Sequence, residues 1–68
     1  MSEIDDVSRA LGEACVQGKT TVATAESCTG GGVGEAITRT PGASAWFDRG
    51  FVTYSNDAKV DLLGVKQE

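Results

Sequence analysis

Residues 20–32 read TTVATAESCTGGG, and residues 44–59 read SAWFDRGFVTYSNDAK. Residues 20–25 are rich in β-branched and small apolar side chains and are too few for a helix that buries a face, so they predict a buried strand. The chain then turns through Ser27 into a glycine-rich stretch. Beyond the turn, apolar residues at helical spacing predict the inner face of a second helix: Val33, Ala36 and Ile37.

The segment before this strand predicts another helix. It covers residues 3–17, with Ser2 as its cap and Gly18 as its stop. Its inner face should consist of the apolar residues that recur at helical spacing, Ile4, Val7, Leu11 and Ala14. The first part of the chain is therefore expected to run from an amphipathic helix into a buried strand.

The segment after the second helix predicts a turn, a strand and a third helix. Proline and glycine within residues 40–43 indicate the turn, and residues 46–54 carry the aromatic side chains of the strand, with Trp46 in the core. Ser55 or Asn56 caps a helix over residues 57–63, which stops at Gly64. The order helix, strand, helix, strand, helix predicts an α/β fold.

Two strands do not make a stable open sheet, because three or more are usually needed. We therefore expect further strands from sequence beyond residues 1–68 or from a second subunit. Residues 1–68 are interpreted as the N-terminal portion of a single domain. The expected protein partner is a second copy, in a homo-oligomer, or the missing half of the domain.

The composition argues against several classes of protein. Ten acidic and six basic side chains give a net charge of −4, which disfavours binding to nucleic acid. No apolar run approaches the ~20 residues that span a bilayer, and the acidic start MSEIDDVSR is unlike a signal peptide. With no histidine and only two cysteines, the chain has too few ligands for a zinc site. We expect a cytoplasmic protein without membrane contact.

The residues around Ser27 suggest nucleophilic chemistry. A serine hydroxyl needs a neighbouring base, and since the chain has no histidine, Lys59 or Tyr54 must serve if Ser27 is catalytic. Tyr54 ends the second strand and Lys59 lies in the first turn of the last helix, so both can project from the same end of the sheet as Ser27. The glycines at 30–32 let a substrate approach backbone N–H groups, which can hold an oxyanion or a phosphate.

Simpler structural interpretations of the same residues stay open. Ser27 or Thr29 can merely cap the helix, while Lys59 can be a surface lysine and Tyr54 a half-buried aromatic. Cys28 is a rival nucleophile, because a thiol at a helix start has a lowered pKa. Glu26 can orient a substrate hydroxyl or simply place negative charge near the helix start. No P-loop or GxGxxG fingerprint is present.

The strings TAESCTGG and SAWFDRGFVTYSNDAK resemble the CinA C-terminal domain family, whose stand-alone members are nicotinamide mononucleotide deamidases of the PncC type. The match spans about residues 22–65. It implies an α/β fold with helices layered on a mixed sheet. It also implies an amidohydrolase that converts nicotinamide mononucleotide to nicotinate mononucleotide and ammonia in pyridine nucleotide salvage. It also implies a nucleotide as the small-molecule substrate and no metal or organic cofactor.

The resemblance places the catalytic serine, tyrosine and lysine at Ser27, Tyr54 and Lys59. In the implied mechanism Lys59, helped by Tyr54, deprotonates Ser27, which attacks the amide carbon. The implied oxyanion-binding residues supply backbone N–H groups: Cys28, Thr29, Gly30 and Gly31. Complete family domains are much longer, so the alternative is an inactive fragment or a nucleotide-binding or interaction module.

Overall fold

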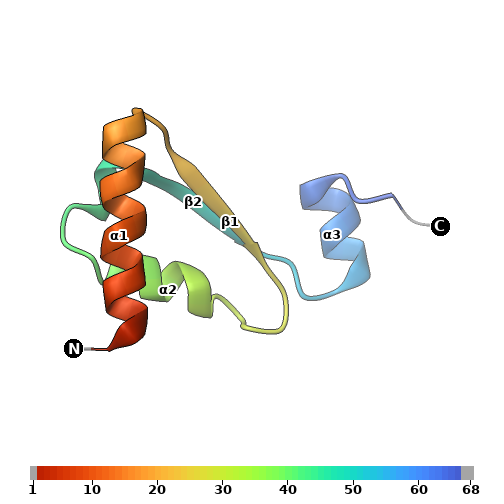
Figure 1. Ribbon diagram of the computed structural model, residues 1–68. Helices are drawn as coiled ribbons and strands as arrows, with labels where there is room; N and C mark the ends of the chain where they lie inside the picture. The colour runs from red at the N-terminus through yellow and green to blue at the C-terminus, as the bar shows by residue number, and fades with distance from the viewer. Residues whose placement is uncertain (1, 67–68) are drawn as a thin grey trace.

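The structure is a computed structural model that describes residues 2–66, so the two ends of the predicted domain lie outside the described residues. Its elements are, in chain order, α1 (Glu3–Gly18), β1 (Val22–Glu26), α2 (Gly32–Thr38), the 3₁₀ turn η1 (Ala43–Ala45), β2 (Phe47–Val52) and α3 (Asn56–Leu63). This order confirms the predicted alternation of helices and strands. Figure 1 shows α1 and α2 near each other and α3 beyond the strands.

The two strands are parallel and pair along their whole length. Their register joins Val22 to Phe47 at one end and Glu26 to Val52 at the other, with an irregularity after Val22. One further bond, from the Thr53 N–H to the Glu26 carbonyl at 2.8 Å, extends the pairing past β2. Because the strands are parallel, their carboxyl ends meet at one edge, and the segments that follow β1 and β2 start side by side.

Both strands are shorter than predicted. The first begins at Val22 because the Thr20 N–H donates to the Cys15 carbonyl at 3.0 Å and so belongs to the end of α1. The second covers Phe47–Val52, since Trp46 closes the 3₁₀ turn through its N–H bond to the Ala43 carbonyl at 3.0 Å. Tyr54 thus lies beyond the strand that was expected to include it.

The helix α1 packs through a different face from the predicted one. The apolar stripe is exposed, with Ile4 at 59%, Val7 at 64% and Leu11 at 37% of full exposure, and Ala14 is exposed as well. The buried residues of α1 are instead small: Ser8, Gly12 and Cys15. This face is buried because the backbone of α1 packs closely against the Trp46 indole. A Cβ at Gly12 would lie 2.8 Å from two atoms of that indole.

The stop of α1 also differs from the prediction. Gly18 is the last helical residue, and Lys19 is the C-cap in a left-handed conformation with φ of 52°. The Lys19 N–H donates to the Val16 carbonyl at 3.2 Å, which satisfies one of the free carbonyls of the last turn. The other predicted ends of α1 and α3 are correct: Ser2 caps α1, Ser55 caps α3 and Gly64 ends α3. The start of α2 differs, because its N-cap is Gly31 and neither Ser27 nor Thr29 caps it with a side-chain hydrogen bond.

The core is small and lies between α1, α2 and the turn before β2. Four buried apolar residues form it: Cys15, Ile37, Ala43 and Trp46. The partly buried Val22 and Phe47 pack against this core. Of the predicted inner face of α2, Ile37 is buried, whereas Val33 is 45% exposed. The helix α3 has no buried residue. Within residues 2–66 no helix has the length and hydropathy needed to cross a membrane.

Candidate active site at the carboxyl ends of the strands

The turn between β1 and α2, residues 27–31, is here named the serine turn. It is held by two bonds of its own, from the Gly30 N–H to the Ser27 carbonyl at 3.1 Å and from the Gly32 N–H to the Thr29 carbonyl at 3.2 Å. Gly30 and Gly31 have φ angles of 62° and 106°. Residues with a Cβ rarely adopt such angles, so the glycines permit the tight path that leaves Ser27 half-buried at the edge of the sheet.

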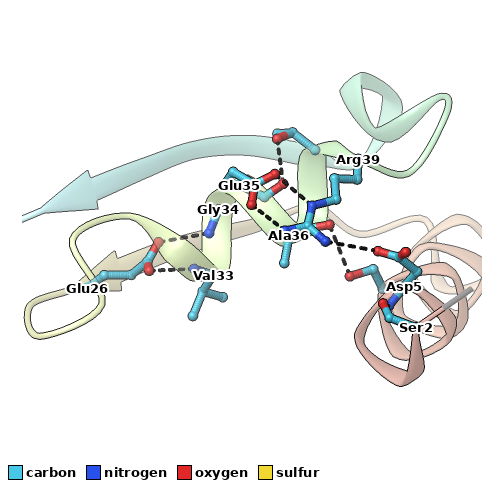
Figure 2. A network of polar contacts seen from close by, with 10 residues as sticks. Ser2, Asp5, Glu26, Val33, Gly34, Glu35, Ala36 and Arg39 are labelled. Carbon is cyan, nitrogen blue, oxygen red and sulfur yellow. Dashed lines mark hydrogen bonds and ion pairs between the residues drawn. The ribbon is translucent and has the colours of Figure 1, made fainter.

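Glu26, the last residue of β1, is buried to 8% exposure and makes three hydrogen bonds. Its Oε1 accepts from the Thr29 hydroxyl at 2.5 Å and from the Val33 N–H at 2.7 Å, and its Oε2 accepts from the Gly34 N–H at 2.8 Å. Figure 2 shows the carboxylate facing the first turn of α2. Glu26 was expected either to orient a substrate hydroxyl or to place negative charge near the start of the helix. The structure shows the second arrangement, because the carboxylate bonds to N–H groups at the start of α2.

These contacts also set the pKa of Glu26. The bond from the Thr29 hydroxyl lowers the pKa most, burial acts in the opposite direction, and the bonds from the Gly34 and Val33 N–H groups lower it further. The net effect is a pKa below the ordinary value of 4.5. The carboxylate is therefore charged at neutral pH although it lies in the interior.

Gly34 lies beside this carboxylate. A Cβ at Gly34 would lie 3.4 Å from Glu26 Oε2 and 3.8 Å from the Phe47 ring. These are ordinary van der Waals distances, so the contact with Glu26 does not itself require glycine within α2, where alanine would favour the helix by roughly 1 kcal/mol.

The free backbone donors of the site lie in the serine turn itself. Within residues 2–66 the N–H groups of Cys28, Thr29 and Gly31 make no hydrogen bond, whereas the Gly30 N–H is taken by the Ser27 carbonyl. Three of the four predicted oxyanion-binding residues thus have a free N–H group, and Gly30 does not. Backbone N–H groups in such a turn can stabilise an oxyanion when it develops beside them.

The three predicted catalytic residues lie on segments at the same edge of the sheet. Ser27 directly follows β1, and Tyr54 lies two residues after β2 with 73% of its surface exposed. Lys59 is half-buried in the first half of α3, whose start is fixed by the Ser55 hydroxyl accepting from the Ala58 N–H at 3.0 Å. No hydrogen bond joins the side chains of Ser27, Tyr54 and Lys59 in the described part of the chain.

Cys28, the rival nucleophile, has an exposed thiol, whereas Cys15 is buried in the core. In the described range, 2–66, no three His, Cys, Asp or Glu side chains gather where they could hold a metal ion. A cavity of about 580 Å³ lies between α1 and the turn at residues 40–42, over Trp46. Its lining includes none of Ser27, Tyr54 and Lys59, so it is separate from the serine turn.

The sequence left the role of Glu26 open between two interpretations, although Glu26 is the most extensively hydrogen-bonded side chain beside the serine turn. Two of its partners are backbone N–H groups seven and eight residues away. No sequence motif predicts a contact of this kind. One signal was available, since Thr29 stands three residues after a carboxylate at a predicted helix start, a spacing at which a hydroxyl can reach back.

Comparison with known proteins gives a consistent result. The CinA C-terminal domain model matches residues 4–68. The chain is 54% identical over 67 residues to the nicotinamide-nucleotide amidohydrolase PncC of Escherichia coli K12, covering 98% of this chain and 41% of that protein. The protein of the same name from Pseudomonas putida is also 54% identical, with 98% and 42% covered.

Solved structures agree with the fold. The competence/damage inducible protein CihA from Agrobacterium tumefaciens superposes with a TM-score of 0.95 at 47% identity, over 100% of this chain and 41% of that one. A competence damage-inducible protein from Klebsiella pneumoniae gives a TM-score of 0.90 at 31% identity, over 96% of this chain and 40% of that one. The chain spans about two fifths of the length of these relatives. It belongs to the CinA C-terminal domain family.

Proposed function

We propose that the protein hydrolyses the carboxamide of nicotinamide mononucleotide, giving nicotinate mononucleotide and ammonia, with Ser27 as the nucleophile. The names of the relatives at 54% identity support this substrate. The observation that carries the chemistry is the serine turn, in which a half-buried serine lies among free N–H groups at the carboxyl edge of the strands.

The proposed reaction has two halves. Lys59, assisted by the Tyr54 hydroxyl, takes the proton of the Ser27 hydroxyl as the serine oxygen attacks the amide carbon. The carbonyl oxygen becomes an oxyanion and accepts hydrogen bonds from N–H groups of the serine turn. The C–N bond then breaks, ammonia leaves with the proton from Lys59, and water hydrolyses the ester to restore Ser27.

The cellular setting is part of the same proposal. We propose that the protein deamidates this nucleotide in pyridine nucleotide salvage, in the cytoplasm and as a homo-oligomer. A small-molecule nucleotide is its substrate, and neither nucleic acid nor a membrane is a partner.

A second candidate is a nucleotide-binding or interaction module without turnover. The length comparison favours it for these 68 residues taken alone, because the chain covers only 41% of the PncC relative. The exposure of Tyr54 at 73% points the same way, since a residue that assists proton transfer usually lies in a site that excludes water. Binding of the nucleotide without ammonia release distinguishes this candidate.

The test is ammonia release from nicotinamide mononucleotide by the protein at its natural full length. Ser27→Ala should reduce kcat by about 10³-fold or more, because removal of a covalent nucleophile leaves only the contribution of binding and oxyanion stabilisation. The matched control is Ser44→Ala, which changes an exposed serine in η1 and should leave kcat as it is. Full activity of Ser27→Ala, with activity lost in Cys28→Ala, would instead identify a cysteine hydrolase.

A further inference from the structure

A charged side chain is buried beside the serine turn. Glu26 has 8% exposure, and its two oxygens accept from three donors, the Thr29 hydroxyl and the N–H groups of Val33 and Gly34. A buried carboxylate is costly unless it is well bonded. The bonds therefore fix the Glu26 side chain in one place.

These bonds occupy N–H donors at the start of α2 that could otherwise bind another anion. Val33 and Gly34 are the second and third residues of α2, whose first N–H groups have no partner within the helix. In many proteins such groups bind a phosphate. Here Glu26 occupies two of them (Figure 2), and its charge repels a phosphate dianion at short range.

The Glu26 carboxylate also holds the serine turn, through a hydrogen bond from a side chain of that turn. The Thr29 hydroxyl bonds to Glu26 at 2.5 Å, and Thr29 also receives the Gly32 N–H at its carbonyl at 3.2 Å. The turn is thus tied both to the end of β1 and to the start of α2. The N–H groups left free are those of the turn, at Cys28, Thr29 and Gly31.

We infer that Glu26 is a positioning residue, which holds the serine turn so that its free N–H groups receive the substrate's carbonyl oxygen, while the substrate's phosphate is bound away from α2. This inference rests on the proposed function and deepens it, because it assigns the turn to the reacting amide. Arg39, at the other end of α2, is bonded to Glu35 and also pairs with Asp5, so its charge is already matched by two carboxylates.

The first experiment compares kcat and KM for Glu26→Gln in the protein at its natural full length. Glutamine has the same size but only one acceptor oxygen, and its NH₂ group would face an N–H donor. Loss of this positioning should lower kcat by about 10- to 100-fold, because small displacements of reacting groups have effects of this size, with KM changed less than about threefold.

The matched control is Ser2→Ala, which removes the cap of α1 far from the serine turn. It should lower the thermal midpoint while kcat stays unchanged at temperatures well below that midpoint. A fall of kcat in Glu26→Gln no greater than in Ser2→Ala would mean that Glu26 only stabilises the fold, and would overturn the inference. If Ser27→Ala keeps its turnover, the proposed function fails and the inference fails with it.

The second experiment uses inorganic phosphate and needs no turnover. The amide signals of Val33 and Gly34 are followed by NMR while phosphate is added to the wild-type protein. They should stay in place, because Glu26 occupies both N–H groups. Saturable movement of these two signals would place a phosphate at the start of α2 and overturn the inference even if Glu26→Gln loses kcat.

Discussion

At the scale of single residues, two glutamates control how the protein responds to acid. The pKa of Glu26 is below its ordinary value because of the Thr29 hydroxyl, against the effect of burial. The pKa of Glu35 is lowered by its hydrogen bonds with Arg39, again against burial. A carboxyl whose pKa is lower in the folded protein stabilises it above the ordinary pKa of 4.5, and this stabilisation disappears as pH falls through the folded value.

We therefore expect the free energy of unfolding to be level from about pH 7 to pH 5.5 and to decrease below about pH 4.5. In Glu26→Gln the decrease should be shallower, because only the contribution of Glu35 remains. Urea unfolding at a series of pH values measures this. Glu13→Gln is the control, since it removes an exposed carboxylate without a hydrogen bond in the described chain, and its acid profile should match the wild type.

The ends of α3 and the serine turn differ in how far their contacts could be predicted from sequence. Ser55 and Gly64 were predicted as the ends of the last helix because capping depends on neighbours a few residues away. The bonds of Glu26 to Val33 and Gly34 form only after the turn has folded back on the strand. Local rules therefore predicted the position of Ser27 but not the side chain that holds its turn.

At the scale of elements, the order of helices and strands could be predicted, but the buried face of α1 could not. The apolar stripe through Val7 suggested one face, yet the contact is made by the face that carries Gly12. Close approach to the Trp46 indole requires the absence of a side chain. Hydrophobic periodicity does not reveal such a contact, because the residues that allow it are small.

Substitution of Gly12 tests this packing. Gly12→Ala places a Cβ 2.8 Å from two atoms of the Trp46 indole. We expect the free energy of unfolding to fall by about 1–3 kcal/mol, because overpacking outweighs the gain in helix propensity.

The control is Gly18→Ala in the same helix, where the nearest atom to the new Cβ is Thr20 Cγ2 at 3.9 Å. It should leave stability unchanged or raise it by up to about 1 kcal/mol. Chemical denaturation of both variants gives the comparison. Equal stability of Gly12→Ala and Gly18→Ala would mean that α1 is not packed tightly against Trp46.

The two serine caps should differ in their effects because their helices differ in burial. Ser2 caps α1, which contributes Cys15 to the core, whereas Ser55 caps α3, which has no buried residue. Ser2→Ala should therefore lower the global free energy of unfolding by about 1 kcal/mol. Ser55→Ala should unwind α3 locally and leave global unfolding within about 0.3 kcal/mol of the wild type.

Carbon chemical shifts of residues 56–63 report the local change, and urea unfolding followed at Trp46 reports the global one. A global loss of the same size in both variants would show that α3 folds cooperatively with the core, in disagreement with its exposure.

At the scale of the whole molecule, exposed large apolar side chains outnumber the buried apolar residues of the core among the described residues. Four apolar side chains form the core, while large apolar side chains stay exposed on several elements, among them Val7 at 64%, Val52 at 52% and Leu62 at 59%. The two-stranded sheet also leaves both outer edges unpaired among the described residues. Surfaces of this kind usually lie against another segment or another chain.

The last prediction is that these 68 residues associate when they are studied alone. A chain of this length buries only about 60% of the surface of its unfolded state, so covering apolar side chains by association contributes a large share of its stability. The thermal midpoint should therefore rise with protein concentration, and sedimentation equilibrium should show species heavier than one chain. Val7→Lys should weaken this association, because it places a charge in the exposed apolar stripe of α1. Gln17→Lys adds the same side chain at an exposed polar position of α1 and should leave association unchanged. A midpoint independent of concentration, with a single species of 7.0 kDa, would show that the small core suffices and that the stripe has no partner of its own kind.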